Sequence, residues 1–133
     1  MDDFSALSQL ILDALGETAG IELAIVFGSL AASSARPDSD LDIAIDAGNP
    51  MTAEEKTVLI DRLASRIGRP VDLIDLQTVG EPLLGQILAG GKRILGSDER
   101  YASLLRQHLF DAADFLPYRD RILEERRRAW IGA

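Results

Sequence analysis

The sequence predicts an α+β domain in which a small sheet is covered by helices. Segments with helical apolar spacing alternate along the chain with short segments rich in β-forming residues. The length of 133 residues suits one domain. Hydrophobic residues make up 47% of the chain and charged residues 27%, so a packed core is expected and wholesale disorder is excluded.

The helices are predicted from apolar residues at helical spacing and from their end signals. Gly16 closes the first amphipathic segment. Thr52 and Glu55 have the spacing of a capping box at a helix start. Pro117 interrupts the last segment, because proline cannot continue a helix interior. The expected helices span 4–15, 52–67, 79–90 and 98–130.

Four strands are predicted from short runs of β-forming residues bounded by turn signals. The first run is apolar and ends at Gly28. The second lies between an Arg-Pro-Asp-Ser turn and a Gly-Asn-Pro break, and Pro70 starts the third. The expected strands span 21–27, 41–45, 71–76 and 92–95, the last as a short edge strand.

Composition excludes several classes of site and partner. Without cysteine there is no disulfide framework or thiolate metal site, and a single histidine, His108, excludes a multi-histidine zinc centre. We expect His108 to be a surface or partly packed residue. The net charge of −8 argues against a protein that mainly grips nucleic acid, so no direct DNA binding is expected. With no ~18-residue apolar span and no basic leader, we expect a cytoplasmic protein without membrane contact.

A candidate anion site surrounds Gly28 and Ser29. Gly28 ends the first strand, and its missing Cβ lets backbone amides approach a ligand. Ser29 adds a hydroxyl, and a helix starting there would point its amide dipoles at a phosphate. A glycine–serine pair is most often an ordinary turn, so this signal is weak by itself.

Asp40 and Asp42 give a stronger signal. Residues two apart in a strand project from the same face, so the two carboxylates are expected to lie close together. Two ionised carboxylates at that spacing repel each other, and each raises the pKa of the other. A divalent cation resolves this conflict, and Mg²⁺ in particular binds a few carboxylates together with substrate phosphates.

A third carboxylate is available from the third predicted strand, where two aspartates compete for the role. Asp72 lies early in that strand and Asp75 late, on opposite faces. If this strand lies beside the second, either residue approaches the Asp40–Asp42 pair, although Asp75 also suits a helix N-cap or loop role. A three-carboxylate site with two metal ions suits nucleotidyl transfer.

The motif Gly28-Ser29, ten residues, Asp40-Leu41-Asp42, with Val-Asp-Leu-Ile-Asp-Leu over 71–76, resembles the polymerase-β-like nucleotidyltransferase superfamily. Within it, the chain is similar to the minimal nucleotidyltransferases, or MNT proteins, the antitoxin partners of HEPN-domain toxins. The resemblance covers most of the chain. It implies a mixed sheet flanked by helices, with a C-terminal helical pair, in a single domain over 1–133.

The resemblance also implies a chemistry and a partner. AMP would pass from ATP, with Mg²⁺ and most simply two ions, to a tyrosine of a HEPN ribonuclease toxin, which silences it. The nucleotide-binding positions would be Gly28, Ser29 and Ser39, and the metal-binding and catalytic positions would be Asp40, Asp42 and Asp72. The resemblance favours Asp72 over Asp75, with Asp72 helping to activate the acceptor hydroxyl.

One departure from the family pattern concerns phosphate binding. Many relatives carry Arg-Gly a few residues after Gly-Ser, whereas this chain has Leu-Ala-Ala-Ser-Ser over 30–34. Neutralisation of the phosphates is therefore expected to fall on metal or on Arg36. The departure motivates an alternative, an antitoxin that neutralises its partner by binding alone. A second alternative is a nucleotidyltransferase acting on a small molecule such as an aminoglycoside.

The C-terminal part, 96–133, is expected to form a helical extension that docks the partner. Its basic tract over 119–128 alternates arginines with acidic residues and suits either a solvated helix face or a docking surface. Trp130 and Ile131 follow this tract and suit interface anchors.

Overall fold

The computed structural model describes residues 3–32, 36 and 39–113. Its elements occur in the predicted order, as helices α1 (Asp3–Leu15), α2 (Ala53–Ile67) and α3 (Leu83–Gly90), strands β1 (Leu23–Phe27), β2 (Leu41–Asp46), β3 (Val71–Asp75) and β4 (Lys92–Leu95), and a 3-10 turn η1 (Gly28–Leu30). A last helix runs over 98–113. The part of the predicted C-terminal pair beyond residue 113, with the basic tract and Trp130, lies outside the described residues.

The four strands form one mixed sheet, which confirms the predicted fold class. Their order is β3-β2-β1-β4, with β2 and β3 parallel and β1 antiparallel to both β2 and β4. Helix α2 provides the crossover that parallel strands require, and Thr52 starts it with the predicted capping box. Gly68 ends α2 in the left-handed conformation that glycine favours, with φ 71°.

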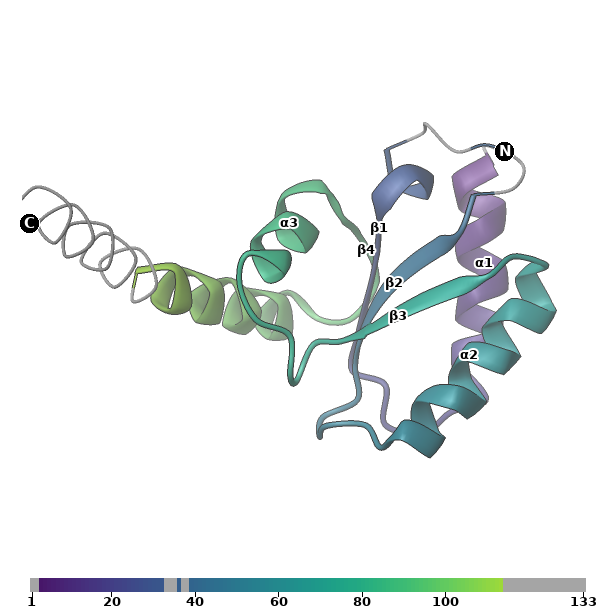
Figure 1. Ribbon diagram of the computed structural model, residues 1–133, viewed down its shortest axis with the longest axis horizontal. Coiled ribbons are helices and arrows are strands. Elements are labelled where there is room, and N and C mark those ends of the chain that lie inside the picture. The colour runs from purple at the N-terminus through teal and green to yellow at the C-terminus, as the bar shows by residue number, and fades with distance from the viewer. Residues whose placement is uncertain (1–2, 33–35, 37–38, 114–133) are drawn as a thin grey trace, which may run out of the picture.

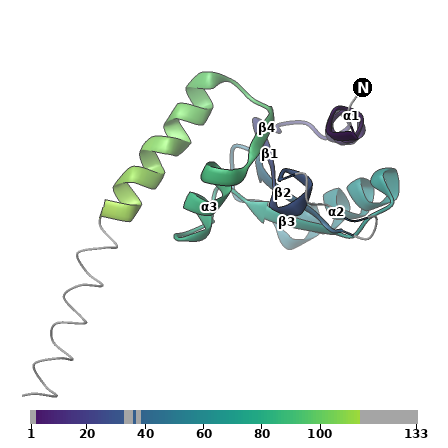
Figure 2. The ribbon, with the colours of Figure 1, turned by 90° about the horizontal axis from the view of Figure 1, so that it is seen from above.

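Each face of the sheet carries its own hydrophobic core. On one face, α1 and α2 pack against Val26, Ile43 and Leu73. On the other face, α3 and the last helix pack against Ile25 and Ala44. Figures 1 and 2 show these two pairs of helices on opposite sides of the strands.

Two expected helices are shorter than the spacing indicated. The predicted helix over 79–90 begins only at Leu83, and a turn over 81–82 precedes it. The helix expected to start at Ser29 is limited to the single turn η1 within the described residues. The amide dipoles at Ser29 are therefore those of one turn and not of a long helix.

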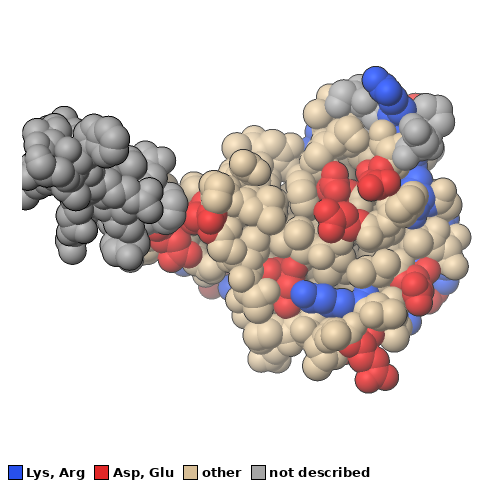
Figure 3. All heavy atoms as spheres, viewed as in Figure 1, with Lys and Arg blue, Asp and Glu red and all other residues tan. Residues whose placement is uncertain are grey.

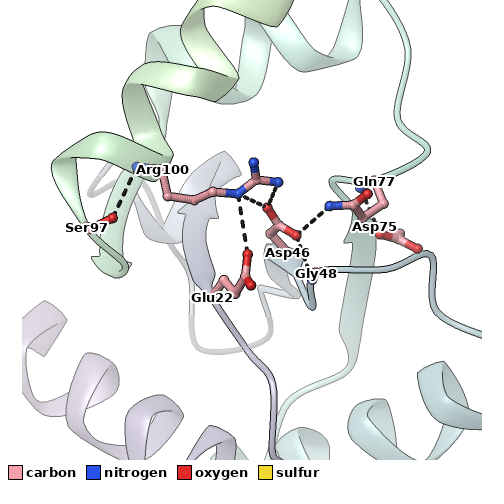
Figure 4. A network of polar contacts seen from close by, with 7 residues as sticks. All are labelled: Glu22, Asp46, Gly48, Asp75, Gln77, Ser97 and Arg100. Carbon is pink, nitrogen blue, oxygen red and sulfur yellow. Dashed lines mark hydrogen bonds and ion pairs between the residues drawn. The ribbon is translucent and has the colours of Figure 1, made fainter.

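A buried carboxylate fastens the last helix to the sheet. Asp46, at the end of β2, is fully buried, and its Oδ2 accepts a hydrogen bond from Arg100 Nε at 2.5 Å (Figure 4). Its Oδ1 accepts from Gln77 Nε2 at 2.8 Å and from the Gly48 amide at 2.9 Å. Glu22 lies 3.6 Å from the same Arg100 Nε.

These contacts decide the charge state of Asp46. Burial by itself would raise the pKa of Asp46, but the hydrogen bonds from Gln77 and Gly48, together with the hydrogen bond and positive charge of Arg100, outweigh it and lower the pKa below its ordinary value of 3.8. The ionised pair therefore ties the helix over 98–113 to β2.

His108 joins the same helix to α3. Its Nδ1 lies 2.5 Å from Glu81 Oε1, and the ring packs so closely on Gly85 that a side chain there would displace it. His108 is partly buried, as the sequence predicts, and it belongs to helix packing.

We predict that Arg100→Met lowers the free energy of unfolding by about 2–3 kcal/mol at pH 7, because it leaves a buried carboxylate without its cation. Arg106→Met, an exposed change on the same helix, should stay within about 0.5 kcal/mol of wild type in chemical denaturation.

The difference in the free energy of unfolding between wild type and Arg100→Met should also depend on pH. When folding lowers the pKa of a carboxylate, the ionised group stabilises the protein at any pH above its pKa in the unfolded state. This stabilisation is lost as the pH falls through its pKa in the folded state. The gap between wild type and Arg100→Met should therefore narrow below about pH 3.8. A gap that is constant from pH 7 to pH 3 would contradict this assignment of charge.

Candidate functional site

The β-sheet register brings the candidate residues together at the start of β2. Asp42 pairs with Phe27 of β1 on one side and with Asp72 of β3 on the other. Gly28 follows Phe27 directly, so the end of β1 meets the first residues of β2 and β3. The registered partners of a sheet share a face, which places Asp42 and Asp72 side by side on the face that also carries α3.

Asp40 lies just outside the ladder and completes the acidic group. It precedes β2 by one residue, it is exposed, and its charge acts on Asp42. Asp72 is also exposed, whereas Asp42 is partly buried. Acidic side chains stand together on the surface in the view of Figure 3.

Asp42 senses the charges of both neighbouring carboxylates. Burial raises the pKa of Asp42 most, and the neighbouring charges of Asp72 and Asp40 raise it further. Among the residues that the structure describes, no cationic side chain contributes to the shift. The sheet therefore holds Asp42 in a place that favours a bound cation.

Position 28 requires glycine for two reasons, its backbone conformation and the close approach of the Asp42 side chain. Its φ is 73°, and a Cβ at this position would collide with the carboxylate of Asp42. Glycine thus lets the turn after β1 lie directly against Asp42, so the candidate anion site at Gly28 and Ser29 adjoins the acidic group. Ser29 follows in η1 and is partly buried.

Ser39 has a structural contact that the sequence analysis missed. Its hydroxyl accepts a hydrogen bond from the Arg36 amide at 2.7 Å, and its own amide donates to the Arg36 carbonyl at 3.0 Å. Arg69 Nη1 donates to the carbonyls of both Ser39 and Arg36, at 2.9 and 3.1 Å. A nucleotide that bound the Ser39 hydroxyl would therefore share it with the Arg36 amide.

Asp75 is placed away from the acidic group. It pairs with Ile45 at the far end of β2 and is 3% exposed. Its carboxylate accepts hydrogen bonds from the Met51 amide at 2.8 Å and the Gln77 amide at 2.9 Å, so it orders two loops. Of the two aspartates left open by the sequence, Asp72 is the one beside Asp42, and Asp75 has the loop role.

The donor set of the acidic group fits Mg²⁺. Carboxylate oxygens are the ligands that this ion prefers, and it completes its coordination with water and substrate phosphates. Across residues 3–32, 36 and 39–113, no three acidic or histidine side chains converge closely enough to hold a metal ion. Asp40, Asp42 and Asp72 therefore do not form a complete metal site by themselves, and a cation there would need further ligands such as water and substrate phosphates.

A separate groove lies on the opposite side of the sheet, between the segment that follows α1 and the first turns of α2. It has a volume of about 460 Å³ and is lined in part by Met51, Val58 and Arg62. It contains none of the candidate residues. Its lining also includes Glu17, Glu54 and Glu55, whose negative charges do not suit a triphosphate.

The chain belongs to the polymerase β nucleotidyltransferase family. The model of that family, described as polymerase beta, nucleotidyltransferase, matches residues 9–100, which include Gly28, Ser29, Asp40, Asp42 and Asp72. This confirms the family resemblance and the fold that the motif implied. No helix within the described residues is long and apolar enough to cross a membrane.

Three proteins are similar to the chain, one in sequence and two in fold. The protein adenylyltransferase MntA of Shewanella oneidensis is 30% identical over 79 residues, which are 59% of this chain and 57% of MntA. A chain from a toxin–antitoxin crystal structure with AMP-PNP superposes with a TM-score of 0.81 at 24% identity, covering 89% of this chain and 96% of that one. A chain from a complex of tri-AMPylated Shewanella oneidensis HEPN toxin with MNT antitoxin gives 0.77 at 22% identity, covering 92% and 97%.

We predict that Gly28→Ala is more damaging than Gly68→Ala. Both glycines have nearly the same positive φ, 73° and 71°, but only at Gly28 does a Cβ meet Asp42, while nothing lies within 4 Å at Gly68. Gly68→Ala should cost about 1 kcal/mol from the left-handed backbone alone. Gly28→Ala should cost at least about 1 kcal/mol more in urea denaturation, and equal costs would contradict the close approach.

We also predict that Asp42→Asn stabilises the protein. A pKa raised in the folded state means that ionised Asp42 opposes folding above its unfolded value, so removing the charge should raise the melting temperature at pH 7 by about 2–5 °C. The gain should vanish near pH 3, where Asp42 is protonated in both states. Asp61→Asn, an exposed change on α2, is the matched control and should leave the melting temperature unchanged.

Proposed function

We propose that this chain is a Mg²⁺-dependent protein adenylyltransferase that transfers AMP from ATP to a tyrosine hydroxyl of a HEPN ribonuclease toxin. The transfer would neutralise the toxin, which makes the chain its antitoxin. The observation that carries the proposal is the position of Asp42, registered against Asp72 on one side and packed against Gly28 on the other. The likeness to the adenylyltransferase MntA and to chains of toxin–antitoxin complexes supports the substrate and the partner.

The proposed roles follow from the position of each group. Gly28 brings the turn after β1 against Asp42, so its backbone would lie beside a triphosphate bound at the acidic group, and Ser29, with Ser39, offers polar groups there. Arg36, which is exposed and hydrogen-bonded to Ser39, takes the place of the missing family arginine in neutralising phosphate. Asp40, Asp42 and Asp72 hold Mg²⁺, which when bound offsets the negative charge of the triphosphate.

Asp72 is also the candidate for the proton transfer. Because its side chain is exposed at the open edge of the acidic group, it can meet a hydroxyl that arrives from a partner protein. The tyrosine oxygen forms a bond to the α-phosphorus, the bond between the α- and β-phosphates breaks, and pyrophosphate leaves. The hydroxyl proton passes to Asp72.

The rest of the proposal concerns the setting of the reaction. A single domain over 1–133 carries the site, and the helical extension over 96–133 docks the toxin. The described start of that extension is fastened to β2 by the Asp46–Arg100 pair, so a docked partner would be held in a fixed relation to the acidic group. We place the reaction in the cytoplasm, where ATP and a ribonuclease toxin meet, and expect no direct contact with DNA.

Intact-mass measurement of a co-expressed HEPN toxin tests the proposal. Wild type with ATP and Mg²⁺ should add one or more AMP groups to the toxin. Asp42→Asn and Asp72→Asn should each lower the rate at least about 100-fold, since each removes a metal ligand or the proton acceptor. Asp61→Asn on α2 should leave the rate unchanged.

Two outcomes would contradict the proposed transfer. If the double variant Asp40→Asn, Asp42→Asn still protects cells and no mass is added to the toxin by wild type, the chain neutralises its partner by binding alone. If the AMP instead appears on an aminoglycoside, the acceptor is a small molecule.

A further inference from the structure

Asp40 is exposed and lies outside the β-sheet ladder, yet a metal ligand must be held in place. Its two neighbours are both tied to the segment that joins α2 to β3. The Ser39 carbonyl, just before Asp40, accepts a hydrogen bond from Arg69 Nη1 at 2.9 Å. The Leu41 amide, just after Asp40, donates to the Pro70 carbonyl at 2.9 Å. Asp40 is therefore bracketed by two contacts with adjacent residues of one segment.

We propose that Arg69 is a positioning residue that fixes the backbone of Asp40 and so sets the affinity of the acidic group for a divalent cation. The inference rests on the proposed function, because it takes Asp40 as a metal ligand. Arg69 belongs to none of the motifs that identify the family in this sequence, and only the fold brings it to the turn before β2.

The geometry suits a clamp. The same nitrogen of Arg69 also donates to the Arg36 carbonyl at 3.1 Å, so one guanidinium holds the carbonyls of both Arg36 and Ser39. Arg36 and Ser39 are also joined to each other through the Ser39 amide and hydroxyl. Arg69 itself is held in place because it lies between Gly68, which ends α2, and Pro70, whose ring restricts the backbone.

The sign of the effect separates a clamp from a simple charge. A guanidinium near a cation site repels the cation, so removing its charge alone would tighten metal binding. Removing a clamp instead lets Asp40 move and weakens metal binding. Groups that orient metal ligands typically account for 10–100-fold in affinity.

The test is Mn²⁺ binding to the purified chain with AMP-PNP and without toxin, measured by electron paramagnetic resonance, because a nucleotide phosphate supplies the ligands that the three carboxylates lack. Arg69→Gln should raise the dissociation constant about 10-fold. Arg69→Lys keeps the charge and a long donor but loses the planar fork, so its affinity should fall between those of wild type and Arg69→Gln. Arg66→Gln is the matched control, because it makes the same change near the end of α2 where the side chain pairs with Glu17, and it should bind as wild type does.

Amide hydrogen exchange gives a second readout that needs no metal. In Arg69→Gln the amides of Ser39 and Leu41 should exchange at least about 10-fold faster than in wild type, while amides in the middle of β2 stay protected. Arg66→Gln should leave the exchange of both amides unchanged.

Affinity for Mn²⁺ that is equal or tighter in Arg69→Gln than in wild type would overturn the inference, and so would unchanged exchange at Ser39. Its failure is distinct from a failure of the proposed function. If wild type binds Mn²⁺ and Arg69→Gln binds it weakly, but no AMP reaches the toxin, the clamp stands and the transfer does not.

Discussion

The candidate site depends on one constraint, the register of three neighbouring strands at Asp42. Parallel pairing with β3 sets Asp72 beside it, and antiparallel pairing with β1 brings the Gly28 turn against its carboxylate. A shift of one residue in either pairing would turn these side chains to the opposite face. The apolar residues of β2 on the other face, packed under α1 and α2, prevent that shift. The core therefore fixes the site that lies on the far side of the same strands.

One face of β2 holds two carboxylates in opposite electrostatic states. Asp42 has neighbouring carboxylates and a raised pKa, whereas Asp46 has a cation, two hydrogen bonds and a lowered pKa. Ala44 separates them and is small enough for α3 to pack over that part of the strand. The half of the face around Asp42 is therefore partly exposed and carries unbalanced negative charge, whereas the half around Asp46 is buried and its charge is balanced. The unbalanced half costs stability, as is common at sites that must bind a ligand.

The segment between α2 and β3 links the fold to the site. Gly68 ends the helix, Pro70 starts the parallel pairing, and Arg69 between them reaches the turn before Asp40. The crossover helix that makes parallel pairing feasible thus also delivers the residue that holds the first aspartate. The exposed Asp40 gains the rigidity of the neighbouring sheet through the two hydrogen bonds of its neighbours Ser39 and Leu41.

The sequence by itself determined the order of the elements, the mixed α+β class and the aspartates of the site, because apolar periodicity, capping residues and motif spacing are local properties. Two carboxylates spaced two residues apart on one strand indicated a metal site, because their charges repel unless a cation lies between them. Only the tertiary structure decided between Asp72 and Asp75, because both lie on one strand and their surroundings come from β2 and the loops it meets. It alone revealed the Asp46–Arg100 pair and the Arg69 clamp, whose partners are 54 and about 30 residues apart. Contacts at that separation depend on packing, and no local pattern encodes them.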